Sequence, residues 1–264
     1  MKPGAAPKGV LTIAGLDPTS GAGGVADALR IAAEGAHPLV VISALTTQTT
    51  RGVSSMAAVD PQLCARQIAA LARDTRIAAV KTGLLPSAAH VRAVAAAHAS
   101  AFPKNTPLVV DPVLASSGGF RFLDARGIAA LKRELFPRAT VVTPNLPELA
   151  RLTGLPTNTR DQIEAAARAL LALGSRAVLA KGGHGEDARH VTDRLIDRAG
   201  MIEFRARRVP IEAHGTGCAL SAILAARLAL GDSIREAAAA AIRRVRSGLR
   251  RARRLGGGAP ILGF

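Results

Sequence analysis

Short apolar runs alternate with segments of helical periodicity along most of this chain. The apolar runs predict buried strands at 10–14, 38–45, 77–81, 108–111, 140–143 and 177–180. Helices are predicted around them, at 25–35, 61–74, 87–98, 125–135, 160–173, 217–230 and 233–255, and a hairpin is predicted at 190–196 and 201–206. Apolar strands that alternate with helices form parallel sheets covered on both faces. The pattern therefore predicts an α/β fold with a mostly parallel central sheet.

The chain has 264 residues and contains no internal repeat or obvious linker. We expect a single domain over residues 10–264 and a flexible N-terminal tail over residues 1–9. No apolar run reaches about 18 residues, and residues 1–9 lack the apolar segment of a signal peptide. Two cysteines, Cys64 and Cys218, are too few for a disulfide scaffold. These features favour a location in the reducing cytoplasm.

The net charge of +16, from 35 Lys and Arg against 19 Asp and Glu, indicates anionic partners. Residues 243–254 alone contain seven arginines. Apolar residues recur at helical spacing through this region and can pack against the protein while the arginines stay in water. They are Ile242, Val245, Leu249 and Ala252. The alternative is a patch for nucleic acid or lipid. Because the chain has no Trp or Tyr for base stacking, we expect neither nucleic acid nor a membrane as a partner.

Polar clusters follow most of the predicted strands at their carboxyl ends. They lie at 15–24, 46–48, 81–85, 111, 143–148 and 181–184. In parallel α/β sheets, ligands bind beyond the carboxyl ends of the strands, where these clusters would meet. Packing alone does not require polar residues along one rim, so their convergence predicts an enzyme.

The first cluster, residues 15–24, is a glycine-rich turn between a strand and a helix. Its GAGGVA segment matches the loose dinucleotide-binding pattern, but the second strand leads into Thr46, Thr47 and Gln48 where a ribose-binding acid is required. A phosphate loop of the G-x-x-x-x-G-K-[ST] type is also absent. A nicotinamide cofactor is therefore disfavoured. Two interpretations stay open: a tight turn that needs positive φ, and a close backbone approach to a small ligand with Asp17 as acceptor.

The segment His214-Gly-Thr-Gly-Cys218 precedes a strongly apolar helix. Backbone N–H groups at a helix start attract an oxyanion, so this segment predicts an anion hole for a transferring phosphoryl group. Cys218 falls in the first helical turn, where the positive end of the helix is expected to lower the thiol pKa. The alternative is a small buried residue at a helix start.

Charged residues at other strand ends add the remaining parts for phosphoryl transfer. Asp111 ends one strand, and Asn145 and Glu148 share one face of a predicted helix start. Glu148 fits two roles, a helix cap or a water-mediated Mg²⁺ site, because Mg²⁺ keeps much of its hydration shell. Lys181, followed by two glycines, offers a cation and flexible backbone to a nucleotide phosphate.

Seven motifs cover the chain from Leu11 to about Gly231: LTIAGLDPTSGAGG, SALTTQTTRGV, VKTGLL, VVDPV, VTPNLPE, AVLAKGGH and HGTGCALSA. In order and spacing they resemble the hydroxymethylpyrimidine/phosphomethylpyrimidine kinases of thiamine biosynthesis, within the ribokinase-like superfamily. The resemblance implies a ribokinase-like three-layer α/β/α sandwich, usually dimeric. It also implies phosphorylation of 4-amino-5-hydroxymethyl-2-methylpyrimidine and of its monophosphate, with ATP and Mg²⁺. The alternative is a pyridoxal or pyridoxine kinase of the same superfamily.

The resemblance further implies roles for individual residues. Around the aminopyrimidine it places Gln48, Gly15, Asp17, Ala22, Thr46 and Leu84. It places Asn145 and Glu148 near Mg²⁺. Together with the strand-end clusters, we expect Thr143, Asn145, Lys181 and Gly183 at ATP, and Asp111 and Glu148 at the metal. The catalytic set is Gly215, Thr216, Gly217 and Cys218.

Three positions depart from the family pattern or lie outside it. Most ribokinase relatives have an aspartate base where Cys218 stands, so this thiol is either a base or an orienting group. Asp27, on the first predicted helix, is expected at the surface. Residues 256–264 lack the histidines that often end the family's chains, which leaves the role of this segment open.

Overall fold

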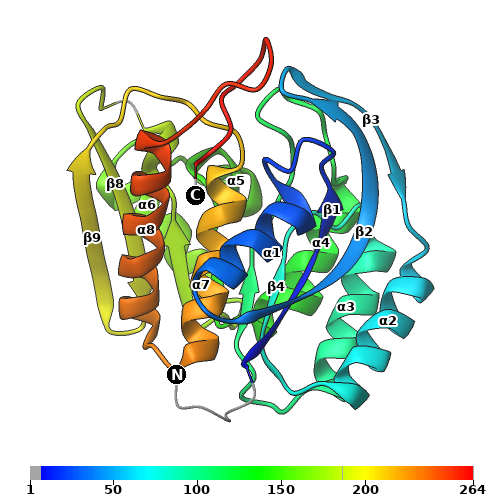
Figure 1. The fold of residues 1–264 in the computed structure, drawn as a ribbon. Helices are drawn as coiled ribbons and strands as arrows, with labels where there is room; N and C mark the ends of the chain where they lie inside the picture. Colours follow the sequence, from blue (N-terminus) through cyan, green and yellow to red (C-terminus); the bar gives the residue numbers. More distant parts are fainter. Residues whose placement is uncertain (1–6, 186, 264) are drawn as a thin grey trace.

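The computed structural model describes residues 7–185 and 187–263, and in this part of the chain a nine-stranded sheet runs through the centre (Figure 1). Its middle is parallel, with the spatial order β2 (His37–Thr49), β1 (Gly9–Leu16), β4 (Ile77–Thr82), β5 (Leu108–Val110), β6 (Val141–Val142) and β7 (Ala177–Ala180). Antiparallel strands form both edges: β3 (Gly52–Ala58) beside β2, then β8 (His190–Asp197) and β9 (Gly200–Arg207) beyond β7. The mostly parallel sheet predicted from the sequence is confirmed.

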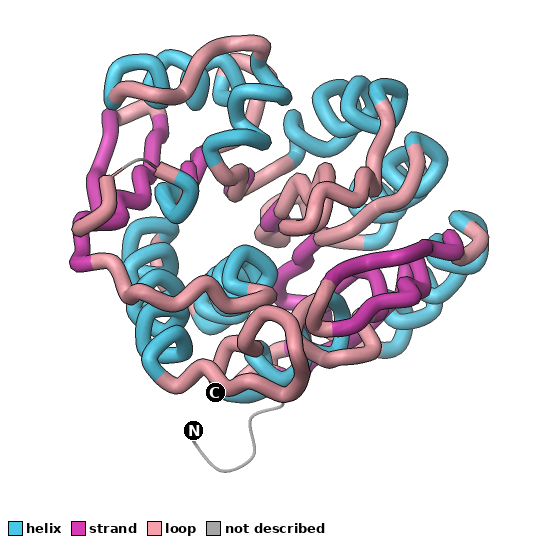
Figure 2. Tube along the Cα trace, turned by 90° about the horizontal axis from the view of Figure 1, so that it is seen from above, coloured by secondary structure: helices cyan, strands magenta, loops and turns pink. Residues whose placement is uncertain are grey.

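Two helical layers cover the sheet, one on each face (Figures 1 and 2). One layer consists of α1 (Gly23–Ala33), α7 (Thr216–Leu230) and α8 (Ile234–Arg250). The other consists of α2 (Pro61–Asp74), α3 (Ala88–Ala101), α4 (Ala125–Ala130), α5 (Leu146–Thr153) and α6 (Arg160–Leu171). Neighbouring strand residues point to opposite layers, since Val109 packs with the first and Val110 with the second. The expected three-layer α/β/α sandwich is confirmed.

Strand β2 differs from its prediction. It continues beyond Leu45 to Thr49 and pairs there with β3, which the sequence pattern did not indicate. Thr46 and Gln48 therefore lie within a strand, not after one. The pattern failed because β3 is an edge strand with no buried residue, so its sequence shows no alternation of apolar and polar positions.

Elsewhere the predicted elements match with smaller changes. The hairpin is confirmed as β8 and β9. The helix predicted at 125–135 divides into α4 and a π-helical turn, Leu131–Leu135. The helix predicted at 233–255 ends at Arg250, because the following residues turn back toward the sheet. Of the expected tail, residues 1–6 lie outside the described residues, and Gly9 begins β1.

Helix α8 holds the arginine-rich region against the protein through the predicted apolar seam. Ile242 and Val245 are buried, and Leu249 packs on the same core. Arg243 and Arg244 are exposed on the opposite face. Over the described ranges, no helix combines the length and the apolar composition that crossing a bilayer requires.

The connections between strands change direction at β1 and β4, which are neighbours in the sheet. The chain leaves β1 toward β2 on one side and leaves β4 toward β5 on the other. Such a pair of strands opens a crevice beyond their carboxyl ends, which is where ligands bind in open α/β sheets.

The C-terminal segment, residues 251–263, returns to this end of the sheet (Figure 1, red). The backbone N–H of His214 donates to Pro260 O at 2.8 Å, and that of Ala259 donates to Thr50 O at 2.8 Å. Arg30 anchors the segment further, with its guanidinium donating to the carbonyl oxygens of Leu262 and Gly263 at 2.7 Å. The segment therefore ties the loop before α7 to the end of β2.

Candidate active site

Two glycine-rich segments meet beyond the end of β1: the first loop, residues 15–24, and the anion loop, residues 214–218. Gly215 has a φ of +85°, and a Cβ there would overlap the carbonyl oxygen of Gly21. Gly23 has a φ of +67°, and its Cβ would overlap the carbonyl oxygen of Gly15. Only glycine allows both the backbone conformation and the approach. Helix α7 begins at Thr216, so its unpartnered first N–H groups lie next to the first loop.

Lys181 lies beside the start of α7, at the end of β7. A Cβ on Gly217 would be 3.1 Å from Lys181 Nζ. The ammonium group also donates to Asp111 Oδ1 at 2.8 Å. Burial alone would lower the pKa of Lys181, but the carboxylates of Asp111 and Glu148 raise it above its usual value. A fixed positive charge therefore stands next to the predicted anion hole.

Asp111 is almost fully buried and engages both of its carboxylate oxygens. Oδ1 accepts from Lys181 Nζ and from Thr143 Oγ1 at 3.2 Å, while Oδ2 accepts from Ser221 Oγ at 3.1 Å. Burial raises the pKa of Asp111, but Lys181 and Lys81 outweigh it and lower that pKa below its usual value. In these contacts Asp111 holds the Lys181 ammonium in place. The metal role expected for Asp111 stays a prediction.

Asn145 and Glu148 form a reciprocal cap at the start of α5. Asn145 Oδ1 accepts from the Glu148 N–H at 2.8 Å, and Glu148 Oε2 accepts from the Asn145 N–H at 2.8 Å. Burial is the main cause that raises the pKa of Glu148 to about 7. The capping role foreseen for Glu148 is confirmed.

The residues present fit Mg²⁺ only in an indirect way. Among the described residues there is no group of three His, Cys, Asp or Glu side chains that could enclose a metal ion. Glu148 is a buried carboxylate beside Lys181 that bonds to backbone N–H groups rather than to a cation. Mg²⁺ in phosphoryl-transfer enzymes uses one or two carboxylates, water and the phosphates themselves. Glu148 fits that donor set.

Cys218 departs from its predicted chemistry. Burial raises the pKa of this thiol to about 11, and the carboxylates of Asp111 and Asp27 add to the effect. Lys81 and a hydrogen bond with the Gly23 backbone act in the opposite direction but do not compensate. The expectation that the helix start lowers the thiol pKa was wrong, because the predicted helix charge is smaller than the cost of ionising a buried sulfur beside two acids.

A buried ion pair that the sequence did not reveal lies in the same region. Lys81 Nζ is 2.6 Å from Asp27 Oδ2, and both side chains are fully buried. Thr12 Oγ1 donates to the same oxygen at 2.6 Å. Burial opposes the charge of Lys81, but Asp27 is the largest cause that raises the Lys81 pKa above its usual value. The expectation that Asp27 lies at the surface was wrong: it faces β1 and β4 from α1.

The predicted substrate residues gather around the first loop. A Cβ on Gly15 would be 3.3 Å from Leu84 Cδ1, so the end of β1 packs on the turn after β4. Thr46 Oγ1 donates to Leu16 O at 2.8 Å. Asp17 Oδ2 accepts from the Ala22 N–H at 3.0 Å, which closes the loop on itself. These contacts bring five of the six predicted residues together at the carboxyl ends of β1 and β4.

The sixth predicted substrate residue, Gln48, reaches the first loop through His214. The amide of Gln48 is 2.9 Å from His214 Nε2, which is 2.7 Å from Asp17 Oδ2. His214 was part of the motif but was not assigned a role. The sequence signal for His214 is its position directly before Gly215. A side chain at that position lies over the first loop.

The contacts of Gly183 differ from those of the other predicted ATP residues. It is exposed, and a Cβ there would meet nothing within 4 Å. Its carbonyl oxygen accepts from Arg208 Nη1 at 2.9 Å, and the same guanidinium donates to Gly185 O at 3.0 Å. Arg208, which the sequence did not single out, therefore shapes the backbone that follows Lys181.

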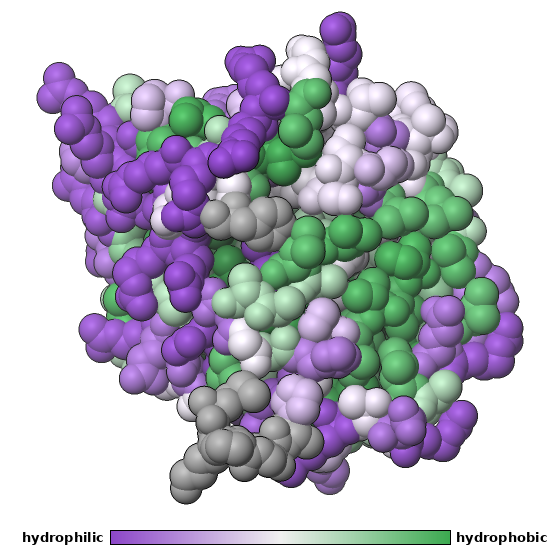
Figure 3. Space-filling model, viewed as in Figure 1, coloured by the Kyte–Doolittle hydropathy of each residue, from purple (hydrophilic) through white to green (hydrophobic). Residues whose placement is uncertain are grey.

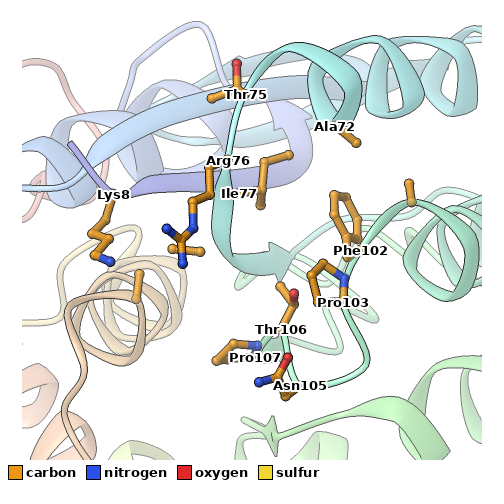
Figure 4. A pocket seen from close by; sticks show the side chains of 13 residues that line it. Lys8, Ala72, Thr75, Arg76, Ile77, Phe102, Pro103, Asn105, Thr106 and Pro107 are labelled. Carbon is orange, nitrogen blue, oxygen red and sulfur yellow. The ribbon is translucent and has the colours of Figure 1, made fainter. Parts of the chain in front are cut away.

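A cavity of about 460 Å³ lies at the opposite end of the sheet (Figure 4). Lys8, Arg76, Phe102 and Pro107 line it, at the amino ends of β1, β4 and β5. It contains none of the predicted site residues. The chemistry-bearing side chains instead converge at the carboxyl ends of the strands, which we take as the candidate active site.

The phosphomethylpyrimidine kinase family model matches residues 17–262. The hydroxymethylpyrimidine/phosphomethylpyrimidine kinase of Salmonella typhimurium is 41% identical over 235 residues, which cover 87% of this chain and 87% of that protein. The thiamine biosynthesis bifunctional protein ThiED of Geobacter sulfurreducens is 41% identical over 254 residues, or 96% of this chain. This chain spans about half, 51%, of that longer protein.

Solved structures give the same result for the fold. The crystal structure of phosphomethylpyrimidine kinase from Clostridium difficile 630 aligns with a TM-score of 0.80 and 31% identity, over 91% of this chain and 98% of that chain. The pyridoxal kinase from Staphylococcus aureus in complex with AMP-PCP and pyridoxal aligns with a TM-score of 0.88 and 27% identity, over 98% and 93%. The ribokinase-like fold implied by the motifs is confirmed, and the chain belongs to the phosphomethylpyrimidine kinase family.

Proposed function

We propose that this protein transfers the γ-phosphoryl group of ATP to the hydroxymethyl oxygen of 4-amino-5-hydroxymethyl-2-methylpyrimidine, and then phosphorylates the resulting monophosphate to the diphosphate. The observation that carries the proposal is that the first loop touches both halves of the site. It contacts the anion loop through Gly21 and Gly215, and it contacts Gln48 through Asp17 and His214. A polar amide for a heterocycle therefore stands beside a phosphate-binding helix start.

In the proposed reaction, the substrate hydroxyl oxygen bonds to the γ-phosphorus while the bond from that phosphorus to the β–γ bridging oxygen breaks, and ADP leaves. The N–H groups of Thr216, Gly217 and Cys218 and the Lys181 ammonium stabilise the charge on the transferring group. The thiolate form of Cys218, a minor species because the thiol pKa is raised to about 11, accepts the hydroxyl proton. Glu148 would hold Mg²⁺ through water, and the ion would supply charge neutralisation at the phosphate oxygens. Thr143 and Asn145 both follow β6: Thr143 holds Asp111, the partner of Lys181, and Asn145 holds Glu148.

The test is ATP turnover by the purified protein with the aminopyrimidine alcohol, its monophosphate and pyridoxal in parallel. The second candidate, a pyridoxal kinase, is favoured by the likeness to the pyridoxal kinase from Staphylococcus aureus. We expect a higher kcat/KM for the two pyrimidines than for pyridoxal. Turnover of pyridoxal alone would contradict the proposal and support the second candidate.

Replacing Gln48 with alanine should raise the KM for the aminopyrimidine by about tenfold to a hundredfold, because a buried polar edge of the substrate loses its partner. The KM for ATP should stay within about twofold. Steady-state kinetics with each substrate varied in turn measure both values. The matched control is Gln62→Ala, on the exposed side of α2, which should change neither constant. An unchanged pyrimidine KM in the Gln48 variant would place Gln48 outside the pocket.

Replacing Glu148 with glutamine should raise the Mg²⁺ concentration needed for half-maximal turnover by about tenfold, because an amide binds a hydrated Mg²⁺ less well than a carboxylate. The control is Glu236→Gln, because Glu236 forms the same reciprocal cap with Ser233 at the start of α8, away from the site. A metal titration of both variants separates the two roles of Glu148. If both variants need the same Mg²⁺ concentration, Glu148 acts only as a helix cap.

We also propose that the protein is a homodimer. An apolar area covers part of α1 and β2 in Figure 3, where Val25, Leu29, Val40 and Leu45 are exposed. Contiguous apolar surface of this kind is typical of protein interfaces. Sedimentation analysis tests this assembly. The unpaired thiols of Cys64 and Cys218 and the use of ATP support the cytoplasmic location that we propose.

A further inference from the structure

The imidazole of His214 connects two predicted substrate residues through a single nitrogen atom. His214 Nε2 is 2.7 Å from Asp17 Oδ2 and 2.9 Å from Gln48 Nε2. Asp17 is almost fully buried, and its other oxygen accepts from the N–H and the hydroxyl of Thr19, both at 2.9 Å. Both oxygens of Asp17 are therefore engaged within the protein. Its contribution is the placement of the first loop and of His214.

The proton on His214 follows from the state of Asp17. Burial raises the pKa of Asp17, but the hydrogen bonds from His214 and Thr19 outweigh it, so the pKa lies below its usual value. Asp17 is thus a carboxylate at neutral pH and can only accept hydrogen bonds. His214 Nε2 must carry the proton that Asp17 accepts, so this nitrogen has no lone pair left to accept from Gln48 Nε2. The amide must therefore be turned by 180°, so that Gln48 Oε1 faces His214 and shares the Nε2–H with Asp17 Oδ2.

The hydroxyl of Thr46 allows this orientation of the amide. Thr46 Oγ1 donates to Leu16 O at 2.8 Å and lies 3.3 Å from Gln48 Oε1. Once the amide is turned, the nitrogen takes that place and Thr46 Oγ1 accepts from it. Rotating the amide by 180° exchanges its nitrogen and oxygen without moving other atoms, and the hydrogen-bond network decides between the two states. Only the turned amide avoids two N–H groups facing each other at His214, and its nitrogen then faces Thr46.

We propose that Asp17 and His214 are positioning residues that lock the Gln48 amide with its oxygen on His214 and its nitrogen on Thr46. The locked amide keeps one N–H and one oxygen lone pair for a ligand. This edge pairs with a heterocycle that presents a ring nitrogen acceptor beside an exocyclic amino donor, as a 4-aminopyrimidine does. Pyridoxal has a ring nitrogen but no amino group beside it. The inference rests on the proposed function and names what sets its substrate selectivity.

The C-terminal segment adds a second support to this arrangement. It accepts a hydrogen bond from the His214 backbone through Pro260 O and bonds Thr50, two residues after Gln48, through the Ala259 N–H. A Cβ on Gly21 would lie 3.4 Å from Ile261 Cγ1 and 2.6 Å from His214 Cδ2, so the histidine ring is packed on the first loop. The C-terminal segment therefore holds both the His214 ring and the end of β2 in place.

The kinetic test replaces His214 with phenylalanine, which keeps a planar ring but removes the Nε2–H. The KM for the aminopyrimidine should rise about tenfold, with kcat and the KM for ATP within about threefold, and the KM for pyridoxal should hardly change. The double variant with Gln48→Ala should be no worse than Gln48→Ala alone, since His214 acts through Gln48. The control is His37→Phe, exposed at the opposite end of β2. An unchanged pyrimidine KM, or additive effects in the double variant, would overturn the proposal.

A second measurement reads the amide directly and does not depend on turnover. The chain has four glutamines and three asparagines, so few side-chain NH₂ signals appear in a ¹⁵N-labelled sample. The Gln48 pair is the one that disappears in Gln48→Ala. Its protons should show contacts with the Thr46 methyl group and none with the His214 ring, and His214→Phe should average the two proton shifts. Contacts with the ring would overturn the inference. Failure of the wild type to phosphorylate the aminopyrimidine would instead overturn the proposed function.

Discussion

Replacing Lys81 with methionine should destabilise the protein by about 3–5 kcal/mol, because it leaves the Asp27 carboxylate buried without its counter-charge. Both side chains are fully buried, and Lys81 Nζ lies 2.6 Å from Asp27 Oδ2. Methionine preserves most of the length of the lysine, so lost packing contributes little. Urea unfolding measures the change. The control is Lys104→Met, because Lys104 is exposed and its loss should change stability by less than about 0.5 kcal/mol.

The double variant Lys81→Met with Asp27→Leu separates the missing charge from a general defect. Removing both charges should recover at least half of the loss, because burying an apolar pair carries no ionic desolvation penalty. If the double variant is as unstable as the single one, the ion-pair explanation is wrong.

The loss in Lys81→Met should also depend on pH. Burial raises the pKa of Asp27 and Lys81 opposes that rise, so without Lys81 the folded-state pKa moves further above the unfolded value. An acid with a raised folded pKa keeps its contribution to stability at low pH and loses it as the pH rises through the folded pKa. The deficit relative to wild type should therefore be larger at pH 8 than at pH 5. If the stability loss of Lys81→Met grows as the pH falls, Asp27 does not have the raised folded-state pKa on which this prediction depends.

The fold was predictable where burial produces a clear pattern. Strands β1, β4, β5, β6 and β7 are buried runs between amphipathic helices, so apolar composition alone located them. The β2–β3 ribbon was not predictable in this way, since β3 has no buried residue and β2 carries polar side chains beyond Leu45. Backbone pairing holds that ribbon together with the packing of Val53 and Met56 on Ala44, Leu84 and Phe122, and backbone pairing leaves little trace in side-chain type.

The site was predictable to the extent that parallel strands end at one rim. Asp111 and Lys181 follow β5 and β7, and the structure joins them at 2.8 Å. The partner of Lys81 was not predictable, because Asp27 lies on α1 and the contact depends on how that helix crosses the sheet. A single lysine within the otherwise apolar run of β4 was the available signal, since a buried ammonium requires an acid.

Cys218 shows why position along the chain alone is a poor guide to pKa. A helix start adds a partial positive charge, which favours a thiolate. Burial and the nearby carboxylates of Asp111 and Asp27 act against it and raise the pKa to about 11. Neither effect is visible without knowing which residues surround the sulfur. At pH 7 only about one Cys218 in 10⁴ is then a thiolate.

Replacing Cys218 with alanine should lower the rate of phosphoryl transfer at pH 8 by about a hundredfold, because the hydroxyl proton loses its acceptor, while the KM for ATP stays within about twofold. Because the thiol pKa is about 11, the thiolate fraction rises about tenfold for each unit by which the pH increases toward that value. The single-turnover rate of the wild type should therefore rise about tenfold per unit between pH 6 and 9, whereas the alanine variant should show no such rise. Rapid-quench measurements with saturating ATP give both profiles.

The matched control for this experiment is Cys64→Ala. Cys64 is the other free thiol, buried on α2 away from the rim, so its removal should leave the slope of the pH profile unchanged. A wild-type rate that does not vary with pH would show that Cys218 orients the substrate as a neutral thiol. Phosphoryl transfer would then depend on the anion loop and Lys181 without a base, which a loose, metaphosphate-like transition state permits because the nucleophile bonds late and keeps its proton until then.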